Sequence, residues 1–485
     1  MSDNLKQKTV SALKWSAVDR FGQQAVQFFI GILLARLLSP EDYGLIGVIM
    51  IFAALSFVLV ESGFGQALIR KQNATDVDYN SVFYFNIFTS ILLYTILFFS
   101  TPYIAAYFNQ PQFDLLGKVI FIAILFNAFY LVPFALMLKK MDFKSIAKVN
   151  LISTTLSGLL GVILAFMSFG VWSLVAQQVS FHFFRMIVYQ IIVKWRPGMT
   201  FSFDVIRNFW GFTLPILGTA LLNVIFNNLY VFILGKYYHK KDVGYYSQAN
   251  KLSETFNFSF QQILLGGTFS MFSQIQNDDE RFRRILREIT RKASIVSIPV
   301  MLVFIAVAHP FVYVLLSAKW LPSAAYFQLL CLASLFTPFY GLNISALNAR
   351  GLSKQTFVIE TSKKILIIFS VFFSFKFGVI TMLWGYVMAS FIAYLISVIY
   401  IKRDITHYIK NQITDLFPAF SIGLLTAIPA YLLSYVIVNN YLLISVQFVV
   451  VLCIYVFSVK VAQPELYRKS LDVVVEKVPF FKKKN

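Results

Sequence analysis

Long apolar runs recur along the whole chain and constrain its fold more than any other feature. Each run is about 20 residues long, the length of an α-helix that crosses a hydrocarbon layer of roughly 30 Å. A membrane β-barrel would instead show alternating apolar and polar residues over segments of about ten. The sequence therefore predicts an all-α protein that crosses a membrane many times.

The composition is also typical of a membrane protein. Hydrophobic residues make up 58% of the 485 residues and charged residues 13%, whereas charged residues make up about 25% of an ordinary soluble protein. We predict about fourteen transmembrane helices from the apolar runs. These helices are predicted at residues 13–37, 44–66, 81–103, 115–137, 149–169, 172–193, 209–234, 244–272, 293–316, 323–347, 357–376, 380–400, 416–438 and 442–460.

Basic residues outnumber acidic residues by 42 to 22, which gives a net charge of +20. In a soluble protein this excess would suggest a nucleic-acid partner, but here the basic residues gather in the loops of one side. Cytoplasmic loops of membrane proteins carry an excess of Lys and Arg. The pattern therefore predicts a multi-pass protein with both termini in the cytoplasm and no nucleic-acid partner.

The sequence contains no feature typical of a bound cofactor or a catalytic centre. Its two cysteines, Cys331 and Cys453, fall in different predicted spans, so that no disulfide or metal pair is indicated. No nucleotide-binding G-x-x-x-x-G-K-[ST] loop is present, and the predicted outer loops are short. We therefore predict no cofactor, no metal site and no catalytic residue, and we do not expect an enzyme.

One segment of the chain occurs twice. LARLLSPEDYG, residues 34–44, has a counterpart in LGKYYHKKDVG, residues 234–244, and both lie between two long apolar runs. A basic residue, an acidic residue and a glycine occupy the same places in the two copies. They are Arg36, Asp42 and Gly44 in the first copy and Lys236, Asp242 and Gly244 in the second. Residues that stop and start helices predict a tight turn between two membrane helices in each copy.

Later segments match one another at a similar spacing. Lys140 and Lys144 correspond to Arg350 and Lys354, about 210 residues further on, as in the parallel repeats of transporters. We therefore predict two six-helix bundles that form a parallel repeat around a central cavity, followed by two additional helices. The predicted parts are residues 1–208 and 209–404 for the bundles, 405–460 for the additional helices and 461–485 for a basic cytoplasmic tail.

Polar and charged side chains interrupt several of the predicted spans. An Arg or Lys in mid-membrane costs roughly 2.5–3.5 kcal/mol, so that such residues usually face protein, water or a partner. We predict that this set lines or adjoins the central cavity. Its members are Asp19, Arg20 and Gln24 in the first span, Glu61 in the second, Gln178 and Arg185 in the sixth, Asn223 and Asn227 in the seventh, and Asn250, Lys251, Glu254 and Asn257 in the eighth.

Structural roles are the alternative for several of these residues. Arg20 and Glu61 lie at similar predicted depth, and they form either a structural ion pair or part of the cavity wall. Lys251 and Glu254 stand three residues apart on one helix, where they either neutralise each other or contact a ligand. Arg185 has no acid nearby in the sequence, which makes it the foremost candidate for binding an anion.

Four segments of the chain resemble one family. They are KWSAVDRFGQQAVQF, LARLLSPEDYGLIG, GFGQALIRK and GVWSLVAQQ. These segments are similar to the Wzx-type flippases of the polysaccharide transporter family, within the multidrug, oligosaccharidyl-lipid and polysaccharide exporter superfamily. The chain looks most similar to the WzxC-like branch, which is linked to the export of exopolysaccharide, colanic acid or lipopolysaccharide.

The resemblance implies a function as well as a fold. It implies transport of an oligosaccharide repeat unit on undecaprenyl diphosphate across a bacterial inner membrane, for the synthesis of lipopolysaccharide O-antigen, capsule or exopolysaccharide. It implies contacts with membrane lipids and with polysaccharide polymerase and assembly proteins. The family has no strict catalytic motif, so that no residue of this chain is assigned a catalytic role.

Under this resemblance the polar candidates fall into two groups, which would act during alternating access. Cations would bind the diphosphate and amides would bind the sugars. The substrate-binding candidates are Arg20, Gln24, Gln178, Arg185, Asn223, Asn227, Asn250, Lys251 and Asn257. The ion-coupling candidates are Asp19, Glu61 and Glu254.

Other functions stay open at this point. An exporter of drugs or of peptidoglycan precursor would share the superfamily, although a cavity for cationic drugs should be rich in acids and these spans carry at least as many bases. A membrane glycosyltransferase or ligase would need acidic residues in a sizeable outer loop, which the sequence does not predict. A membrane scaffold for glycan assembly would tolerate the loss of every cavity charge.

Overall fold

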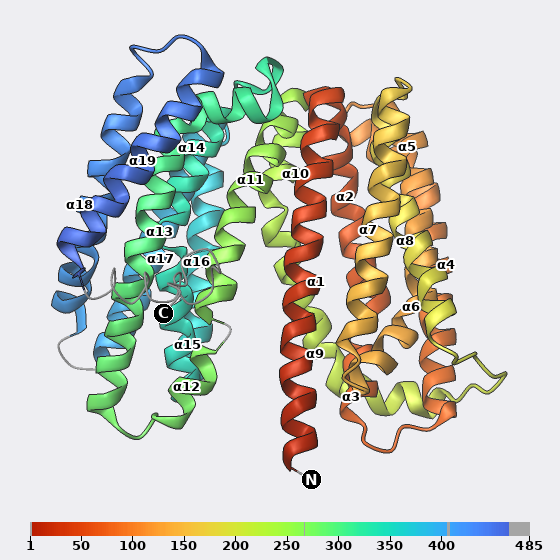
Figure 1. The fold of residues 1–485 in the computed structure, drawn as a ribbon. Helices are drawn as coiled ribbons and strands as arrows, with labels where there is room; N and C mark the ends of the chain where they lie inside the picture. The colour runs from red at the N-terminus through yellow and green to blue at the C-terminus, as the bar shows by residue number, and fades with distance from the viewer. Residues whose placement is uncertain (1, 266, 405–407, 465–485) are drawn as a thin grey trace, which may run out of the picture. The chain divides into compact units, whose positions relative to one another are not determined.

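The computed structural model describes residues 2–265, 267–404 and 408–464 (Figure 1). All regular secondary structure in these ranges is helical, which confirms the prediction of an all-α fold. The predicted basic tail falls outside the described residues from residue 465 onward.

The chain divides into two compact units, Met1–Ser247 (unit 1) and Gln248–Asn485 (unit 2). Helix α11 (Lys240–Leu265) begins in unit 1 and continues into unit 2. The other helices of unit 1 are α1 (Ser2–Leu37), α2 (Pro40–Glu61), α3 (Phe64–Arg70), α4 (Asp76–Tyr107), α5 (Gln112–Ile120), α6 (Ile122–Lys139), α7 (Phe143–Phe166), α8 (Val171–Ile192), α9 (Phe203–Asn227) and α10 (Leu229–Tyr237). Those of unit 2 are α12 (Thr268–Gln274), α13 (Asp279–Leu316), the short 3-10 helix η1 (Ala318–Trp320), α14 (Ser323–Ser334), α15 (Thr337–Ala349), α16 (Ser353–Ser374), α17 (Val379–Asp404), α18 (Tyr408–Leu433) and α19 (Asn440–Ala462).

In the described part of the chain, 10 helical segments are long and apolar enough to cross a membrane. Each coincides with a predicted span, which confirms a multi-pass membrane protein but leaves the predicted number of about fourteen open. The remaining predicted spans are occupied by α1, α8, α11 and α16. These helices carry many of the polar and charged residues of the apolar runs, and such side chains lower the hydropathy of a span.

Several predicted spans consist of two helices instead of one. The predicted span 44–66 is divided into α2 and α3 by Ser62 at φ 43° and Gly63 at φ 73°, and left-handed backbone of this kind ends an α-helix. Other spans divide in the same way, into α5 and α6, α9 and α10, α11 and α12, and α14 and α15. The expectation of one continuous helix in each of these spans is wrong. Hydropathy predicts which residues lie in an apolar environment, but it does not predict where the backbone turns.

The order of the helices recurs along the chain. The long helix α4 is followed by the divided pair α5 and α6 and then by α7 and α8, as α13 is followed by α14 and α15 and then by α16 and α17. The compact units meet after Ser247, whereas the predicted bundles meet after residue 208. A compact unit is defined by contacts between helices, whereas a repeat is defined by the similarity of two sequence segments. The two boundaries need not coincide, and the predicted domain boundaries stay predictions.

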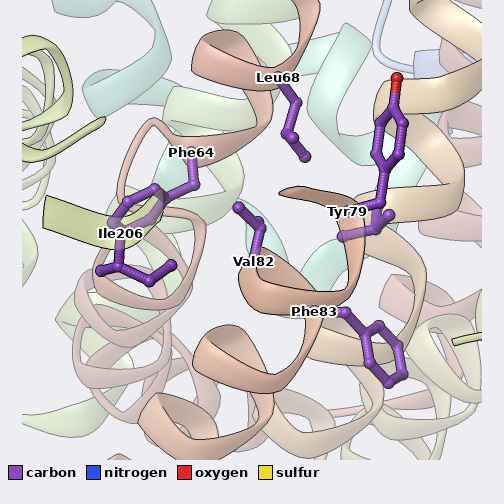
Figure 2. Close-up of a cluster of buried hydrophobic side chains, with 7 residues drawn as sticks. Phe64, Leu68, Tyr79, Val82, Phe83 and Ile206 are labelled. Carbon is purple, nitrogen blue, oxygen red and sulfur yellow. The ribbon is translucent and has the colours of Figure 1, made fainter. Parts of the chain in front are cut away.

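A cluster of buried apolar side chains joins four helices of unit 1 (Figure 2). Its members are Phe64 and Leu68 of α3, Tyr79, Val82 and Phe83 of α4, Val132 of α6 and Ile206 of α9. Close van der Waals contact between such side chains is a main contribution to helix packing in a membrane protein. The cluster therefore fixes the short helix α3 directly after the end of α2.

Helix α1 lies along α7 at close range (Figure 1). A Cβ atom on Gly158 of α7 would lie 1.9 Å from Cδ1 of Ile30 in α1. A larger residue at this position would therefore require the Ile30 side chain to shift. The glycine lets α1 pack against α7 beside the polar contacts described below.

The helices α18 and α19 pack against α13 within unit 2. Nε of Arg287 in α13 donates a hydrogen bond to Oδ2 of Asp415 in α18 over 2.6 Å. The hydroxyl of Tyr455 in α19 donates to the backbone oxygen of Ile295 in α13 over 3.2 Å. Both additional helices are thus fixed to α13 by a polar contact as well as by apolar packing.

Replacement of Asp415 with alanine is expected to lower the free energy of unfolding by about 1.5–3 kcal/mol, the usual value of a hydrogen bond to a charged group. The side chain of Asp415 is only 7% exposed, so that water replaces the lost contact poorly. Thermal unfolding of the purified protein would measure the loss. Glu288→Ala is the control, because Glu288 pairs with Lys292 on an exposed surface and should contribute less than about 1 kcal/mol. An equal loss in both variants would contradict the prediction.

Candidate functional site

Helix α8 presents a continuous polar face. Gln178, His182, Arg185 and Tyr189 stand one, two and three turns apart, at positions that share one face of an α-helix. No proline or glycine interrupts α8 between Val171 and Ile192. His182 and Tyr189 are buried, and Arg185 is half-buried.

The guanidinium group of Arg185 lies among aromatic rings. Its Cζ atom is 4.7 Å from the centre of the Tyr130 ring, 5.7 Å from the centres of the Phe134 and Phe181 rings, and 5.8 Å from that of Tyr189. Ring faces attract a cation within about 6 Å of their centres. The side chains of α6 and α8 therefore stabilise a positive charge in an apolar part of unit 1.

The hydrogen-bonding capacity of Arg185 is only partly used. Its Nη1 donates to the hydroxyl of Tyr130 over 3.4 Å, while its buried Nε has no hydrogen-bond partner among the described residues. A guanidinium carries five N–H donors in a planar arrangement that matches carboxylate and phosphate oxygens. The geometry therefore suits the binding of an anionic oxygen group.

His182 connects Arg185 and its surrounding aromatic rings to a third helix, α2. Its Nδ1 lies 3.0 Å from the hydroxyl oxygen of Tyr130 in α6. The ring of Phe57 in α2 stacks on the His182 ring with 4.5 Å between centres. Side chains of α2, α6 and α8 thus hold the Tyr130 ring in place under the guanidinium of Arg185.

Glu61, the last residue of α2, lies within electrostatic range of Arg185, but the two side chains form no ion pair among the described residues. The helix ends at Glu61 because Ser62 and Gly63 adopt left-handed backbone, which places the carboxylate at the boundary of α2 and α3. Sequence reasoning paired Glu61 with Arg20 instead. Arg20 is exposed on α1, and its pairing with Glu61 stays a prediction.

Asp19 is held between α1 and α7. The side-chain amide of Asn150 in α7 donates to both carboxylate oxygens of Asp19, each over 3.1 Å, and that of Gln23 donates over 2.8 Å. The carboxylate therefore joins the two helices at the interface that Gly158 keeps narrow. A role of Asp19 in ion coupling stays a prediction.

Replacement of Asn150 with alanine is expected to lower the free energy of unfolding by about 1.5–3 kcal/mol, because Asp19 would lose a hydrogen-bond donor to its charge. Thermal unfolding would measure the change. Gln23→Ala, which removes a donor within α1 itself, should cost less. Normal stability of Asn150→Ala combined with loss of ion-dependent activity would contradict the structural role of Asp19.

The polar residues of α11 form a smaller group in unit 2. The amide of Asn250 donates to Oε1 of Glu254 over 3.0 Å, one turn further along α11. Lys251 is exposed, and in the described part of the chain no ion pair joins it to Glu254. The buried Oδ1 of Asn257 has no hydrogen-bond partner among the described residues. Glu254 is thus bonded to an amide, and the suggested pairing with Lys251 is not formed.

The remaining candidates lie on three helices of unit 1. Gln24 of α1 and Gln178 of α8 are half-buried, and Asn223 and Asn227 of α9 are exposed one turn apart. Within the predicted set, the structure joins Asn250 to Glu254 by a hydrogen bond, whereas Arg185 and Glu61 lie within electrostatic range of each other without an ion pair among the described residues. A shared cavity wall stays a prediction for the set.

Sequence reasoning missed three of the aromatic residues around Arg185, namely Tyr130, Phe134 and Phe181, and a second cation. Nζ of Lys363 in α16 lies 4.5 Å from the centre of the Tyr340 ring in α15. Tyr340 stands in α15 about where Tyr130 stands in α6, as the helix order of the repeat would place it. The equivalent positions of Tyr130 and Tyr340 could have been noticed in the sequence. Each tyrosine lies among many other aromatic residues, however, and only the structure shows that it contacts a cation.

An apolar groove of about 620 Å³ runs along another face of α8. Leu160 and Leu164 of α7, Phe126 of α6, and Trp172 and Val179 of α8 line it together with neighbouring apolar residues. The groove and the polar face occupy different sides of the same helix. Helix α8 therefore presents a charged group to one side and a hydrocarbon-like surface to the other.

Comparison with known protein families tests the identity of the chain. Residues 33–325, more than half of the sequence, match the profile of a family described as polysaccharide biosynthesis protein. The chain belongs to this family. The resemblance found in the sequence segments is thus confirmed at the level of the family.

Two known bacterial proteins extend the comparison. The chain is 26% identical to the succinoglycan biosynthesis transport protein ExoT of Rhizobium meliloti (strain 1021), over 66% of this chain and 65% of the relative. It is 23% identical to the lipopolysaccharide biosynthesis protein WzxC of Escherichia coli (strain K12), over 90% of this chain and 89% of the relative.

The fold of this family member is also similar to a solved structure. The structure described as lipid II flippase MurJ, inward closed conformation, matches 95% of this chain and 100% of its own chain with a TM-score of 0.76 and 16% sequence identity. At this level of identity the match establishes the helical membrane fold, and the ligand of MurJ is not transferred by it.

Proposed function

We propose that this protein moves an oligosaccharide repeat unit, linked to undecaprenyl diphosphate, from the inner to the outer leaflet of a bacterial inner membrane. The repeat unit is a building block of a surface polysaccharide, which is lipopolysaccharide O-antigen, capsule or exopolysaccharide. Membership of the polysaccharide biosynthesis family and similarity to a succinoglycan transport protein support the proposal. The proposed activity is transport and needs no catalytic residue.

The observation that carries the proposal is the environment of Arg185. The residue is a cation in a predicted membrane span, with a buried N–H donor that has no partner in the described part of the chain, and aromatic rings stabilise its charge. Such a cation is costly within a membrane unless it has a function or a compensating contact. A diphosphate carries the anionic oxygens that a guanidinium binds with two parallel hydrogen bonds.

The chain also has side chains suited to the sugars and the lipid of the substrate. Amide side chains such as Asn223 and Asn227 are suited to bind sugar hydroxyls, and the apolar groove beside α8 is suited to hydrocarbon. We propose that the two halves alternate between inward and outward access, with both termini in the cytoplasm. An ion gradient or the membrane potential would supply the energy, and Glu61, Glu254 and Asp19 are the proposed coupling carboxylates.

The decisive experiment uses inner-membrane vesicles from a bacterial strain that lacks the protein. Undecaprenyl-diphosphate-linked glycan is expected to accumulate on the cytoplasmic face, and wild-type protein is expected to restore exposure on the outer face. An added sugar-cleaving enzyme, which cannot cross the membrane, reports the leaflet. A completed unit on the outer face without the protein would overturn the proposal and favour a ligase, a drug exporter or a scaffold.

A further inference from the structure

The two copies of the repeated motif lie against each other within unit 1. A Cβ atom on Gly44 would stand 1.9 Å from the backbone oxygen of Lys240, and a Cβ atom on Gly244 would stand 1.9 Å from the backbone oxygen of Pro40. Each glycine therefore touches the carbonyl group that lies four residues before the other glycine. The contact is reciprocal, as expected where two copies of one segment meet around a local two-fold axis.

The contact joins the first turns of two helices. Pro40 is the first residue of α2, and Lys240 is the first residue of α11. The start of α2 is fixed by a capping box, in which Ser39 and Asp42 bond each other's backbone N–H groups. A rigid helix start is therefore pressed against the start of α11 with no side chain between the two backbones.

One ion pair accompanies the backbone contact. Nζ of Lys241 lies 3.1 Å from Oε1 of Glu41, and the hydrogen bond to Glu41 raises the pKa of Lys241. Lys241 is exposed, and exposed ion pairs contribute little to stability. The interface thus has strict steric requirements at the two glycines, and buried apolar side chains such as Val48 and Val243 lie beside them.

Helix α11 is the element through which the chain passes from unit 1 to unit 2, after Ser247. The reciprocal glycine contact holds the first turns of this helix to unit 1. A change in the direction of these first turns would alter the contact.

We propose that the Gly44 and Gly244 contact is a releasable clamp on the start of α11, closed in this structure and opened during each transport cycle. The inference rests on the proposed transport function, and it adds residues that contact no substrate. In the predicted topology the clamp lies at the outer surface. Its opening would then accompany release of the substrate to the outer leaflet.

The first test changes the steric fit. Gly44→Ala and Gly244→Ala are each expected to reduce transport about tenfold, because a side chain at a closed backbone contact forces the helices apart. Gly218→Ala in α9 is the matched control, since a Cβ atom there would meet nothing within 4 Å. Normal transport by both clamp variants would overturn the proposal.

The second test does not depend on a destabilising substitution. The double variant Glu41→Cys and Lys241→Cys places thiols at an exposed contact, where a short reducible bis-thiol reagent can connect them. Without the reagent the variant is expected to transport normally, and after cross-linking transport should stop until the linker is reduced. Undiminished transport by the cross-linked protein would show that the clamp need not open, and would overturn the proposal.

The yield of the cross-link between the two introduced thiols of the double variant tests the clamp without measuring transport. In membranes, Gly44→Ala added to the cysteine pair is expected to lower the yield several-fold, whereas Gly218→Ala should leave it unchanged. This result is independent of any glycan assay. If wild-type protein moved no glycan but the yields differed as expected, the transport proposal would fail while the glycine clamp stood. Equal yields would overturn the clamp whatever the transport assay gave.

Discussion

Replacement of Arg185 with alanine is expected to abolish export of surface polysaccharide while leaving the amount of folded protein in the membrane unchanged. Truncation of one member of a buried, hydrogen-bonded charge pair costs about 2–5 kcal/mol, which corresponds to a loss of about 30-fold or more in binding. The aromatic rings of Tyr130 and Phe134 would remain, but they offer no N–H donor to a diphosphate. Outer-face exposure of lipid-linked glycan in vesicles measures the effect.

Two further variants define the role of the guanidinium. Arg185→Lys keeps the charge but loses the planar arrangement of donors, and it should retain part of the activity. Arg196→Ala removes an exposed arginine that donates to nearby backbone oxygens beyond the end of α8, and it should behave as wild type. A fall in protein abundance equal to the fall in export by Arg185→Ala would assign a packing role to Arg185.

The positions of the membrane helices could be predicted from the sequence because each depends on local composition. An apolar run of about 20 residues has few alternatives to a membrane helix. The breaks within the helices could not be predicted in the same way. Ser62 and Gly63 end α2 through their backbone angles, and Phe64 then re-enters the apolar interior, so that hydropathy stays high across the turn.

The candidate site could be predicted only where its residues share one helix. Gln178 and Arg185 stand at helical spacing, and the sequence shows that they share a face. Tyr130 belongs to α6, and its contact with Arg185 depends on how α6 packs against α8. Asp19 illustrates the same limit, because Asn150, which holds it, lies on α7. A carboxylate that the sequence suggests as an ion-binding group can thus accept hydrogen bonds from side chains of the same protein.

The repeated motif shows how sequence and structure complement each other. The two glycines could be recognised as corresponding positions from the sequence, where they suggested no more than similar turns. The structure shows that Gly44 and Gly244 face each other's helix starts. Glycine is unfavourable inside a helix compared with alanine, and the close approach of two backbones explains why it occupies both positions.

Replacement of Phe64 with alanine is expected to cause a large loss of stability in unit 1. Truncation of a buried Phe costs about 3–5 kcal/mol, because apolar contacts are lost and a cavity remains. Phe64 is 0% exposed, its ring stacks on that of Trp210 with 5.8 Å between centres, and it meets the Phe85 ring edge-on at 5.0 Å. Thermal unfolding of the purified protein would measure the loss.

The variant should also affect transport, because Phe64 holds α3 immediately after Glu61 and the left-handed turn (Figure 2). Phe88→Ala is the control, since Phe88 is 65% exposed on the surface of α4 and its removal leaves no internal cavity. Equal unfolding temperatures for the two variants would contradict the prediction. If Phe64→Ala lost stability but kept full transport, the close packing of α3 against α4 and α9 would not be needed for transport.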